Sequence, residues 1–386
     1  MNMKTIPYGR QHVTEEDIQA VVSVLRSDNL TQGPKVKEFE DAFAGYIGSK
    51  YAVAVANGTA ALHLSALALH VKPGDKVITT PITFVASANC VRYCGGEVVF
   101  ADIDSETYLL DIDRVRTILE NAPRGAFQGI IPVDYAGYPL NLEAYRELAD
   151  EYGLWLLEDA CHAPGGYFVD GAGQRRFCGN GHYAELAVFS FHPVKHIAAG
   201  EGGMVTTNDE KLYRRLLNLR THGIQQDPGK LEDNHGPWYY EMQELGFNYR
   251  LTDIQSALAI SQVQRAARNL ERRHDIARRY DEAFRDMPIV TPKVAAQAFH
   301  AYHLYVIRSE RRDELLRYLR ELRIMVQVHY IPVHYQPYYR RRGWKKGDFP
   351  VAEAFYRQCL SLPIYPSLTE GEQEYVIKKI SDFFQG

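Results

Sequence analysis

The stretch Leu154–Ala163, LWLLEDACHA, joins an uninterrupted apolar run to two acidic residues. A short apolar run without polar alternation is typical of a strand that is buried on both faces of a parallel sheet. Six further runs have a similar character, and helical patterns separate most of them: Tyr51–Asn57, Lys76–Pro81, Glu97–Ile103, Gly129–Tyr135, Leu186–His192 and Gly203–Asn208. This alternation predicts an α/β fold with a mostly parallel seven-stranded sheet and helices on its faces.

The predicted helices divide the chain into two units. In the first unit we expect an N-terminal helix and four helices that each follow a strand: Glu15–Ser27, Ala60–His70, Val85–Cys94, Ile112–Asn121 and Leu142–Tyr152. The Gly-rich residues 163–184 predict a loop with a short hairpin. Beyond residue 250 the pattern predicts one long helix and then shorter strands and helices: Asp253–Arg285, His303–Arg308, Arg311–Leu322, Val326–Tyr330, Ala352–Cys359 and Glu370–Phe384. We therefore expect a large sheet domain (residues 1–250) and a smaller α+β domain (residues 251–386).

The charge balance of the chain excludes a surface that is basic overall. Lys and Arg number 44 against 48 Asp and Glu, which gives a net charge of −4. We therefore expect no nucleic-acid partner and no membrane partner. No apolar run reaches the length of a membrane span, and the first residues, MNMKTIPYGRQHV, lack the apolar segment of a signal peptide. Five scattered cysteines form no disulfide framework. These features predict a cytoplasmic protein.

The motif NGTAAL, residues 57–62, follows the first predicted sheet strand and opens a helix. A helix N-terminus binds anions through its free N–H groups and its dipole, so phosphate is the natural ligand. The alternative is an ordinary strand-to-helix turn capped by Thr59. The motif is neither GxGxxG nor GxxxxGK[ST], which disfavours a dinucleotide site or a P-loop.

Two further motifs place reactive side chains at the ends of predicted strands. LLEDACHA brings Asp159 to the end of one strand, and VFSFHPVKHIAAGEGG, residues 188–203, brings Ser190 and Lys195 to the end of another. Taken alone, Asp159 could be a metal ligand or a helix cap, and Lys195 could be a solvated surface lysine. Together with the helix N-terminus they predict a site for pyridoxal phosphate. The lysine would bind its aldehyde covalently, and the acid would pair with its ring nitrogen.

Five motifs occur in a recognisable order: NGTAAL, PITFVASAN, EDACHA, FSFHPVKHIAAGEGG and LGFNYRLTDIQSAL. In this order the chain resembles the DegT-like family of nucleotide-sugar aminotransferases, which are fold-type I pyridoxal-phosphate enzymes. The resemblance covers essentially the whole chain. It implies an aminotransferase with pyridoxal 5'-phosphate as cofactor and no metal, and a homodimer whose active sites are shared between subunits.

The resemblance also implies roles for individual residues. Lys195 matches the catalytic lysine that holds the cofactor, and Asp159 matches the acid that pairs with its ring nitrogen. The other cofactor-binding positions match Thr59, Ala60, Ser190 and Asn248 for the phosphate, Phe84 for the ring face and His162 for the 3-hydroxyl group. Asn248 would be donated by the neighbouring subunit. Many members carry Gln at the position of His162.

Four segments are most similar to the pseudaminic-acid-pathway branch of the family: IPYGRQ, DNLTQG, WYYEMQELGFNYRLTDIQ and VQVHYIPVHYQPYY. Members of this branch more often carry His at the position of His162. This similarity implies transfer of the amino group of L-glutamate to C4 of UDP-2-acetamido-2,6-dideoxy-β-L-arabino-hexos-4-ulose, which gives UDP-4-amino-4,6-dideoxy-N-acetyl-β-L-altrosamine. The implied substrate-binding residues are Tyr8, Asn29, Thr31, Gly58, Ser190, Asn248, His329 and Tyr330. Ile331 replaces a lysine found in some members.

Several local patterns have competing interpretations. Cys161, His162, Cys178 and His182 have a loosely zinc-like spacing, but the first two are adjacent, which disfavours a metal site. His192 is either a hydrogen-bonded support for Lys195 or a group with a direct role. The basic and aromatic stretch Tyr338–Lys346, YYRRRGWKK, could be a solvated loop, bind nucleic acid or face a uridine diphosphate.

Competing functions remain at the level of the whole chain. One is an aminotransferase for another nucleotide-linked 3-keto or 4-keto-6-deoxy sugar. A pyridoxal-phosphate-dependent sugar 3-dehydratase of the same family would need His in place of Lys195. A non-catalytic regulator with this fold predicts loss of Lys195 or Asp159, and the chain retains both.

Overall fold

A seven-stranded sheet forms the centre of the computed structural model, which describes residues 5–385. Its strands lie in the order β2 (Tyr51–Val55), β10 (Gly203–Thr207), β9 (Leu186–Ser190), β6 (Trp155–Asp159), β5 (Gly129–Ile131), β3 (Lys76–Thr79) and β4 (Glu97–Phe100). The pairs from β9 to β4 are parallel, whereas β10 is antiparallel to both β9 and β2. The predicted mostly parallel seven-stranded sheet is confirmed.

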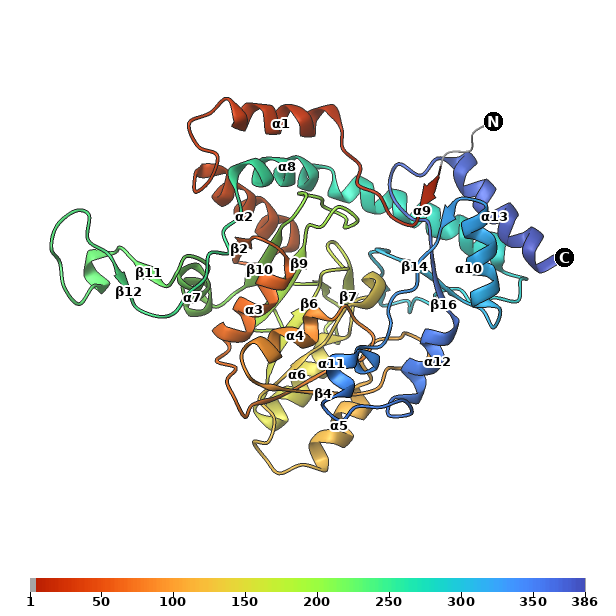
Figure 1. The fold of residues 1–386 in the computed structure, drawn as a ribbon, viewed down its shortest axis with the longest axis horizontal. Coiled ribbons are helices and arrows are strands. Elements are labelled where there is room, and N and C mark those ends of the chain that lie inside the picture. Colours follow the sequence, from red (N-terminus) through yellow and green to blue (C-terminus); the bar gives the residue numbers. More distant parts are fainter. Residues whose placement is uncertain (1–4, 386) are drawn as a thin grey trace.

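Helices cover both faces of this sheet (Figure 1). They are α2 (Pro34–Ile47), α3 (Gly58–Ala68), α4 (Ala86–Tyr93), α5 (Ile112–Glu120), α6 (Leu142–Tyr152) and α7 (Glu210–Arg220). Alternate side chains of each strand enter different cores, so that Val205 of β10 belongs to the core with α3 and Met204 to the core with α2. In the second core, Phe43 of α2 packs edge-on against Phe189 of β9, with ring centroids 4.9 Å apart.

Helix α2 is absent from the sequence-based prediction, although its ends carry clear signals. Pro34 occupies the first turn, where its missing N–H needs no partner, and Gly48 ends the helix in the left-handed region at φ 83°. Within residues 163–184 the structure has β7 (Tyr167–Val169) and β8 (Arg175–Phe177), which form the expected hairpin, and β13 (Ala298–Phe299) pairs with β7. The short strands β11 (Ile224–Gln225) and β12 (Glu241–Met242) form a second hairpin, which projects from the body of the molecule (Figure 1).

The C-terminal third begins with two helices instead of the single helix predicted at 253–285. Helix α8 (Asp253–Gln264) and helix α9 (Ala266–Phe284) meet at Arg265, whose backbone (φ −114°, ψ 9°) is not helical. The elements that follow are β14 (Tyr305–Arg308), α10 (Arg312–Glu321), α11 (Pro337–Arg340), α12 (Pro350–Gln358), β16 (Cys359–Leu362) and α13 (Glu370–Gln385). β14 pairs with β16, a strand that was not predicted.

The strand predicted at Val326–Tyr330 is wrong. The regular strand β15 covers only Ile324–Met325 and pairs in parallel with β1 (Ile6–Pro7). The chain then leaves this ladder, and the residues from Gln327 to Ile331 line a cavity beside the central sheet. Val326 is buried in the C-terminal core, whereas the residues after it line the cavity, so the segment resembles a strand in sequence without forming a ladder.

The N-terminal segment contacts two separate parts of the structure: β1 pairs with β15, and the helix that follows packs on α8. After β1, helix α1 (Glu15–Leu25) packs along α8, and the two helices lie side by side in Figure 1. Within residues 5–385, no helix is long and apolar enough to cross a membrane. The division into domains at residue 250 stays a prediction.

Candidate active site

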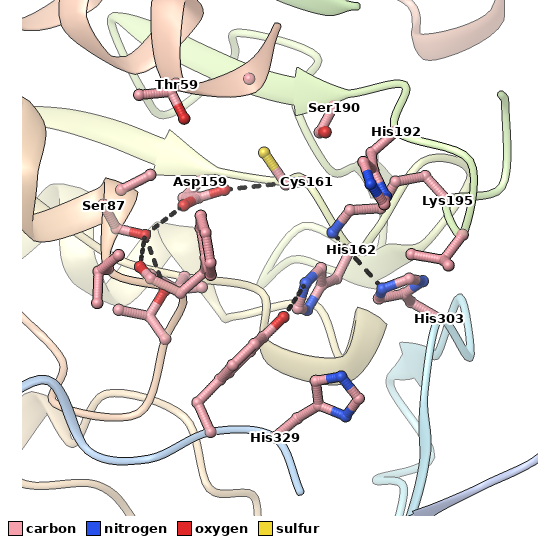
Figure 2. A pocket seen from close by; sticks show the side chains of 18 of the residues that line it. Thr59, Ser87, Asp159, Cys161, His162, Ser190, His192, Lys195, His303 and His329 are labelled. Atoms are coloured by element: carbon pink, nitrogen blue, oxygen red, sulfur yellow. Dashed lines mark hydrogen bonds between the residues drawn. The ribbon is translucent and has the colours of Figure 1, made fainter. Parts of the chain in front are cut away.

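A cavity of about 720 Å³ opens at the carboxyl ends of β6 and β9. This is the edge at which open α/β sheets bind their ligands. Figure 2 shows side chains from several elements converging on this cavity. Ten of the residues singled out from the sequence line it: Tyr8, Gly58, Thr59, Phe84, Asp159, His162, Ser190, Lys195, His329 and Tyr330.

The N-terminus of α3 forms one wall of the cavity. Asn57, and not Thr59, caps this helix, because its side chain accepts a hydrogen bond from the N–H of Ala60 at 2.8 Å. The N–H groups of Gly58 and Thr59 belong to the first turn, which has no intrahelical acceptors. A Cβ atom on Gly58 would lie 3.0 Å from Cβ of Ser190, so glycine allows the helix end and the end of β9 to approach closely. The two ends form a cradle with the properties of an anion site.

Asp159 is held rigidly at the end of β6. Its Oδ2 accepts a hydrogen bond from the hydroxyl of Ser87 at 2.6 Å, and its Oδ1 accepts one from the N–H of Cys161 at 3.2 Å (Figure 2). The residue is 5% exposed and is paired with no basic side chain within residues 5–385. A carboxylate held in this way can pair with a cationic ring nitrogen.

Phe84 presents an unusually exposed aromatic ring to the cavity. The residue is 56% exposed and lies just before α4, with its ring centroid 6.2 Å from that of Tyr330. A large apolar side chain is costly to leave in water, whereas a flat ligand could stack on it.

Lys195 follows β9 in a tight turn, in which its N–H donates to the carbonyl of His192 at 2.8 Å. Its Nζ lies 3.5 Å from Nε2 of His303. Burial lowers the pKa of Lys195, and the nearby Cys161 and Asp159 oppose this effect. A lysine with a lowered pKa is a better nucleophile and base near neutral pH than one in water.

His162 connects the sheet domain to the segment after β15. Its Nδ1 accepts a hydrogen bond from the N–H of Ala136 at 3.2 Å, and its Nε2 lies 3.1 Å from the hydroxyl of Tyr330. Because Nδ1 accepts, the neutral ring carries its proton on Nε2. The neighbouring His329 is fixed by Ser361 at 2.8 Å and packs against Tyr8, with ring centroids 5.0 Å apart. Burial lowers the pKa of His329 to about 3.

Four of the predicted residues do not line the cavity. Ala60 is buried in α3. Asn29, Thr31 and Asn248 are exposed. Thr31 forms a β-bridge with Thr252, close in sequence to Asn248, so these residues belong to neighbouring parts of the surface.

The structure adds residues that the sequence analysis did not single out. Ser87 orients Asp159, and His303 faces Lys195 (Figure 2). The only signal in the sequence for a role of Ser87 is that it follows Phe84 by one helical turn. His303 comes from a segment 108 residues away in the sequence, so no local pattern could have indicated it. His192 lines the cavity but is exposed.

The zinc alternative is not supported by the arrangement of its residues. His162 lies in the cavity, whereas Cys178 is buried and His182 is exposed. The group that does cluster in the described part of the chain contains Asp134, Glu158 and Cys178. The stretch 338–346 carries exposed Arg and Lys side chains beside Tyr338, and its Trp344 packs on Phe100 of β4.

Comparison with known proteins identifies the family. The DegT/DnrJ/EryC1/StrS aminotransferase family matches residues 11–381. The chain belongs to this family. It is 39% identical over 390 residues to the spore coat polysaccharide biosynthesis protein SpsC of Bacillus subtilis, and the match covers 99% of this chain and 97% of SpsC.

Solved structures of family relatives agree with this result. Spr1654 of Streptococcus pneumoniae, described as a sugar aminotransferase, matches in its PMP form with a TM-score of 0.90 and 28% identity over 98% of this chain and 99% of that chain. It has also been solved in a PLP form. Helicobacter pylori PseC, an aminotransferase of pseudaminic acid biosynthesis, matches with a TM-score of 0.88 and 30% identity over 99% of this chain and 100% of that chain.

These relationships establish the chemistry of the protein. It is a pyridoxal-phosphate-dependent nucleotide-sugar aminotransferase with the fold-type I architecture, and it uses a sugar substrate and an amino donor. The cavity fits this cofactor, because it combines an anion cradle, a fixed carboxylate, an exposed aromatic ring and a lysine with a lowered pKa.

Proposed function

We propose that this protein transfers the amino group of L-glutamate to C4 of UDP-2-acetamido-2,6-dideoxy-β-L-arabino-hexos-4-ulose. The products are 2-oxoglutarate and UDP-4-amino-4,6-dideoxy-N-acetyl-β-L-altrosamine, a step of pseudaminic acid biosynthesis in the cytoplasm. The observation that carries the proposal is the cavity in which Lys195 and Asp159 meet the segment of His329 and Tyr330. The similarity to Helicobacter pylori PseC supports the choice of sugar.

In this proposal most of the groups that hold the cofactor come from one chain. Lys195 binds it covalently, Asp159 pairs with its ring nitrogen, and Phe84 covers one ring face. Thr59 and Ser190 would hold its phosphate at the N-terminus of α3. The N–H of Ala60, the third group that the family resemblance implies here, donates to the side chain of Asn57 in this structure. His162 would donate to the 3-hydroxyl group from Nε2, the nitrogen that lies 3.1 Å from the hydroxyl of Tyr330 in this structure, because its Nδ1 is engaged with Ala136.

Pyridoxal phosphate supplies an electron sink for the charge that develops at the reacting carbon. Lys195, once released from the cofactor, takes the proton from the α-carbon of glutamate and returns it on the cofactor side. Burial favours this role, because it lowers the pKa of the amine. The same lysine then moves a proton in the opposite sense when C4 of the sugar receives the amino group, so the kinetics are ping-pong.

We propose that the sugar nucleotide lies between the cofactor and the C-terminal segment. Tyr8, His329 and Tyr330 line the cavity on this side. The two rings of Tyr8 and His329 pack together, and the hydroxyl of Tyr135 donates to the carbonyl of His329 at 2.6 Å, which makes this wall rigid. A rigid wall suits recognition of sugar stereochemistry.

We further propose that the protein is a homodimer with shared active sites. Asn29, Thr31 and Asn248 are exposed on one chain, so they would contact substrate and cofactor phosphate in the other subunit. The projecting hairpin supports this arrangement, because it carries large apolar side chains that are strongly exposed: Trp238 (73%), Tyr240 (55%), Met242 (63%) and Leu245 (77%). Exposed apolar groups of this number mark an interaction surface.

Product analysis tests the sugar. The purified protein is incubated with glutamate and a panel of UDP- and dTDP-linked 4-keto and 3-keto sugars, and the amino sugars are identified by mass spectrometry and NMR. We expect amination at C4 of the UDP-linked sugar and no product from Lys195→Ala. Exclusive use of a dTDP-3-keto sugar would contradict the pseudaminic assignment and favour the alternative of another nucleotide sugar.

A further inference from the structure

His303 lies beside the reactive end of Lys195, although it comes from the C-terminal third of the chain. Its Nε2 is 3.5 Å from Nζ of Lys195, and its ring centroid is 4.3 Å from that of His162 (Figure 2). His303 is 4% exposed and lines the same cavity as Lys195. No acidic side chain forms an ion pair with Lys195 within the described residues, so His303 is the polar neighbour that its amine meets.

The backbone around His303 is held by contacts from three directions. The N–H of Ala301 and the N–H of Leu304 donate to the carbonyls of Gly137 (2.7 Å) and Ala136 (3.1 Å). A Cβ atom on Gly137 would lie 3.0 Å from the backbone nitrogen of His303, so only glycine permits this approach. The carbonyl of Ala301 lies 2.7 Å from Nε2 of His196, the residue after Lys195.

The third set of contacts that hold this backbone comes from α9 and from the loop itself. The buried guanidinium of Arg273 donates to the carbonyls of Tyr302 at 3.0 Å and His303 at 3.4 Å. Tyr302 has φ 49°, which a non-glycine residue rarely adopts, and its N–H donates to Nδ1 of His300 at 2.7 Å. Strain of this kind persists where the surroundings over-determine the conformation, and it concentrates at functional sites.

The hydrogen-bonding state of the His303 ring follows from its neighbours. An ammonium group only donates, so Nε2 of His303 accepts from Lys195 and the proton of the neutral ring lies on Nδ1. That Nδ1 is buried and meets no hydrogen-bond partner among the described residues. A buried unpaired N–H is costly, which makes a purely structural role for this histidine unfavourable.

We propose that His303 is a positioning residue for Lys195: its neutral Nε2 accepts a hydrogen bond from Nζ whenever Lys195 is released from the cofactor. This bond holds the amine over the cavity and stabilises its charged form. The inference rests on the proposed role of Lys195 and does not depend on which sugar the enzyme uses.

Titratable groups from every neighbouring element surround His303 and Lys195 and influence their charge states. They are Asp159 of β6, Cys161 and His162 of the following turn, His196, His329 of the segment after β15, and Arg273 of α9. Burial lowers the pKa of His303 well below its usual value, and the charge of Lys195 lowers it further. His303 therefore stays neutral near pH 7 and remains able to accept.

The first experiment measures the protonation of Lys195 without turnover. The full-length enzyme is loaded with pyridoxamine phosphate, which leaves Lys195 free, and is acetylated with limiting acetic anhydride over a range of pH. Mass spectrometry then gives the pH at which Lys195 is half reactive. We expect this midpoint to fall by about one pH unit in His303→Phe, because the ammonium loses its acceptor. His303→Gln, whose side-chain oxygen can accept, is expected to keep it.

The second experiment follows the reaction with glutamate alone by cofactor absorbance. In His303→Phe we expect the acidic limb of the pH–rate profile to move to lower pH and the rate to fall about tenfold. In His303→Gln we expect both the limb and the rate to be close to those of the wild type. His182→Gln, an exposed histidine outside the cavity, is the matched control and should leave both midpoints unchanged. Thermal melting checks that each variant is folded.

Three outcomes would overturn the proposal: an unchanged midpoint in His303→Phe, the same loss in His303→Gln as in His303→Phe, or an equal shift in His182→Gln. Both experiments use glutamate or no substrate. A wrong sugar assignment would therefore leave them unaffected, and it would appear only in the product analysis of the wild-type enzyme.

Discussion

At the scale of single residues, the orientation of Asp159 depends on Ser87. The hydroxyl of Ser87 donates to Oδ2 of Asp159 and also lies 2.7 Å from the hydroxyl of Thr83. The carboxylate is thus fixed before any ligand enters, so little reorganisation is needed when it meets a ring nitrogen.

This arrangement predicts a graded effect of two substitutions. Asp159→Asn removes the charge and is expected to slow the reaction with glutamate about 100-fold. Ser87→Ala leaves the charge but removes one of its hydrogen bonds, with an expected loss of about tenfold. Stopped-flow absorbance of the cofactor measures both rates. Equal losses in the two variants would show that Ser87 does more than orient the carboxylate.

A second pair of acidic residues, Asp134 and Glu158, is buried next to β6. Oδ1 of Asp134 accepts from the N–H of Leu140 at 2.9 Å, and Oε2 of Glu158 accepts from the N–H of Gly179 at 2.9 Å. The two carboxyl groups also interact with each other, through a side-chain hydrogen bond that requires a proton on one of them. Burial raises the pKa of both Asp134 and Glu158, so the pair retains a proton near neutral pH.

This pair predicts a stability that falls as the pH rises. The folded pKa of Asp134 lies above its unfolded value, so its contribution is complete below about pH 4 and is lost as the pH rises through the folded pKa. Between about pH 5 and 8 we expect the free energy of unfolding to fall by at least about 1 kcal/mol more in the wild type than in Asp134→Asn. Urea denaturation measures this difference. The exposed Asp113→Asn serves as control, and identical pH profiles for wild type and Asp134→Asn would contradict the prediction.

At the scale of elements, a buried ion pair joins α1 to α8. Asp17 of α1 is fully buried and accepts from Nη1 of Arg265 at 2.8 Å, from Nε2 of Gln262 at 2.9 Å and from the N–H of Thr14 at 2.9 Å. Arg265 is also the residue at which α8 ends and α9 begins. One ion pair therefore fixes the N-terminal helix and the junction of the two central helices.

Breaking this pair is expected to loosen the N-terminal segment. Asp17→Ala leaves a guanidinium without its partner, so the free energy of unfolding should fall by about 3 kcal/mol. Chemical denaturation measures the change, and limited proteolysis should show earlier cleavage before α1. Glu15→Ala, an exposed change in the same turn, is expected to have little effect. A loss as large in Glu15→Ala would point to helix propensity as the cause.

At the scale of the whole molecule, the shared active site can be tested by complementation. Lys195→Ala and Asn248→Ala are each expected to be poorly active. A homodimer of the first variant lacks Lys195 in both active sites, and a homodimer of the second lacks Asn248 in both. In a mixed dimer, one site would receive Lys195 from one subunit and Asn248 from the other. Refolding the two variants together should restore about a quarter of wild-type activity. No recovery would show that Asn248 does not act across the interface.

The apolar hairpin gives an independent test of the dimer. Trp238→Ser combined with Leu245→Ser removes two of its most exposed apolar side chains. We expect dissociation to the monomer, measured by analytical ultracentrifugation, because these groups have no contact that would bury them within one chain. A variant that stays dimeric would show that the interface lies on another surface.

The prediction from sequence was most accurate where the signal is local. Strands such as β6 and β9 were found because a short continuous apolar run bounded by turn residues is typical of a buried strand. The junction at Arg265 was missed because helical periodicity continues through it. The segment Val326–Tyr330 was misread because its first residue packs in a core and the others line a cavity.

The sequence by itself determined the seven strands of the central sheet, the carboxylate and the lysine at strand ends, and the family with its cofactor. These follow from periodicity, from turn residues and from motifs that lie within a few residues of each other. Only the tertiary structure brought Ser87 to Asp159 and His303 to Lys195, and only it showed that Asn57 caps α3. Contacts between segments 72 and 108 residues apart are decided by how the layers pack, and packing leaves no trace in the local pattern of either segment.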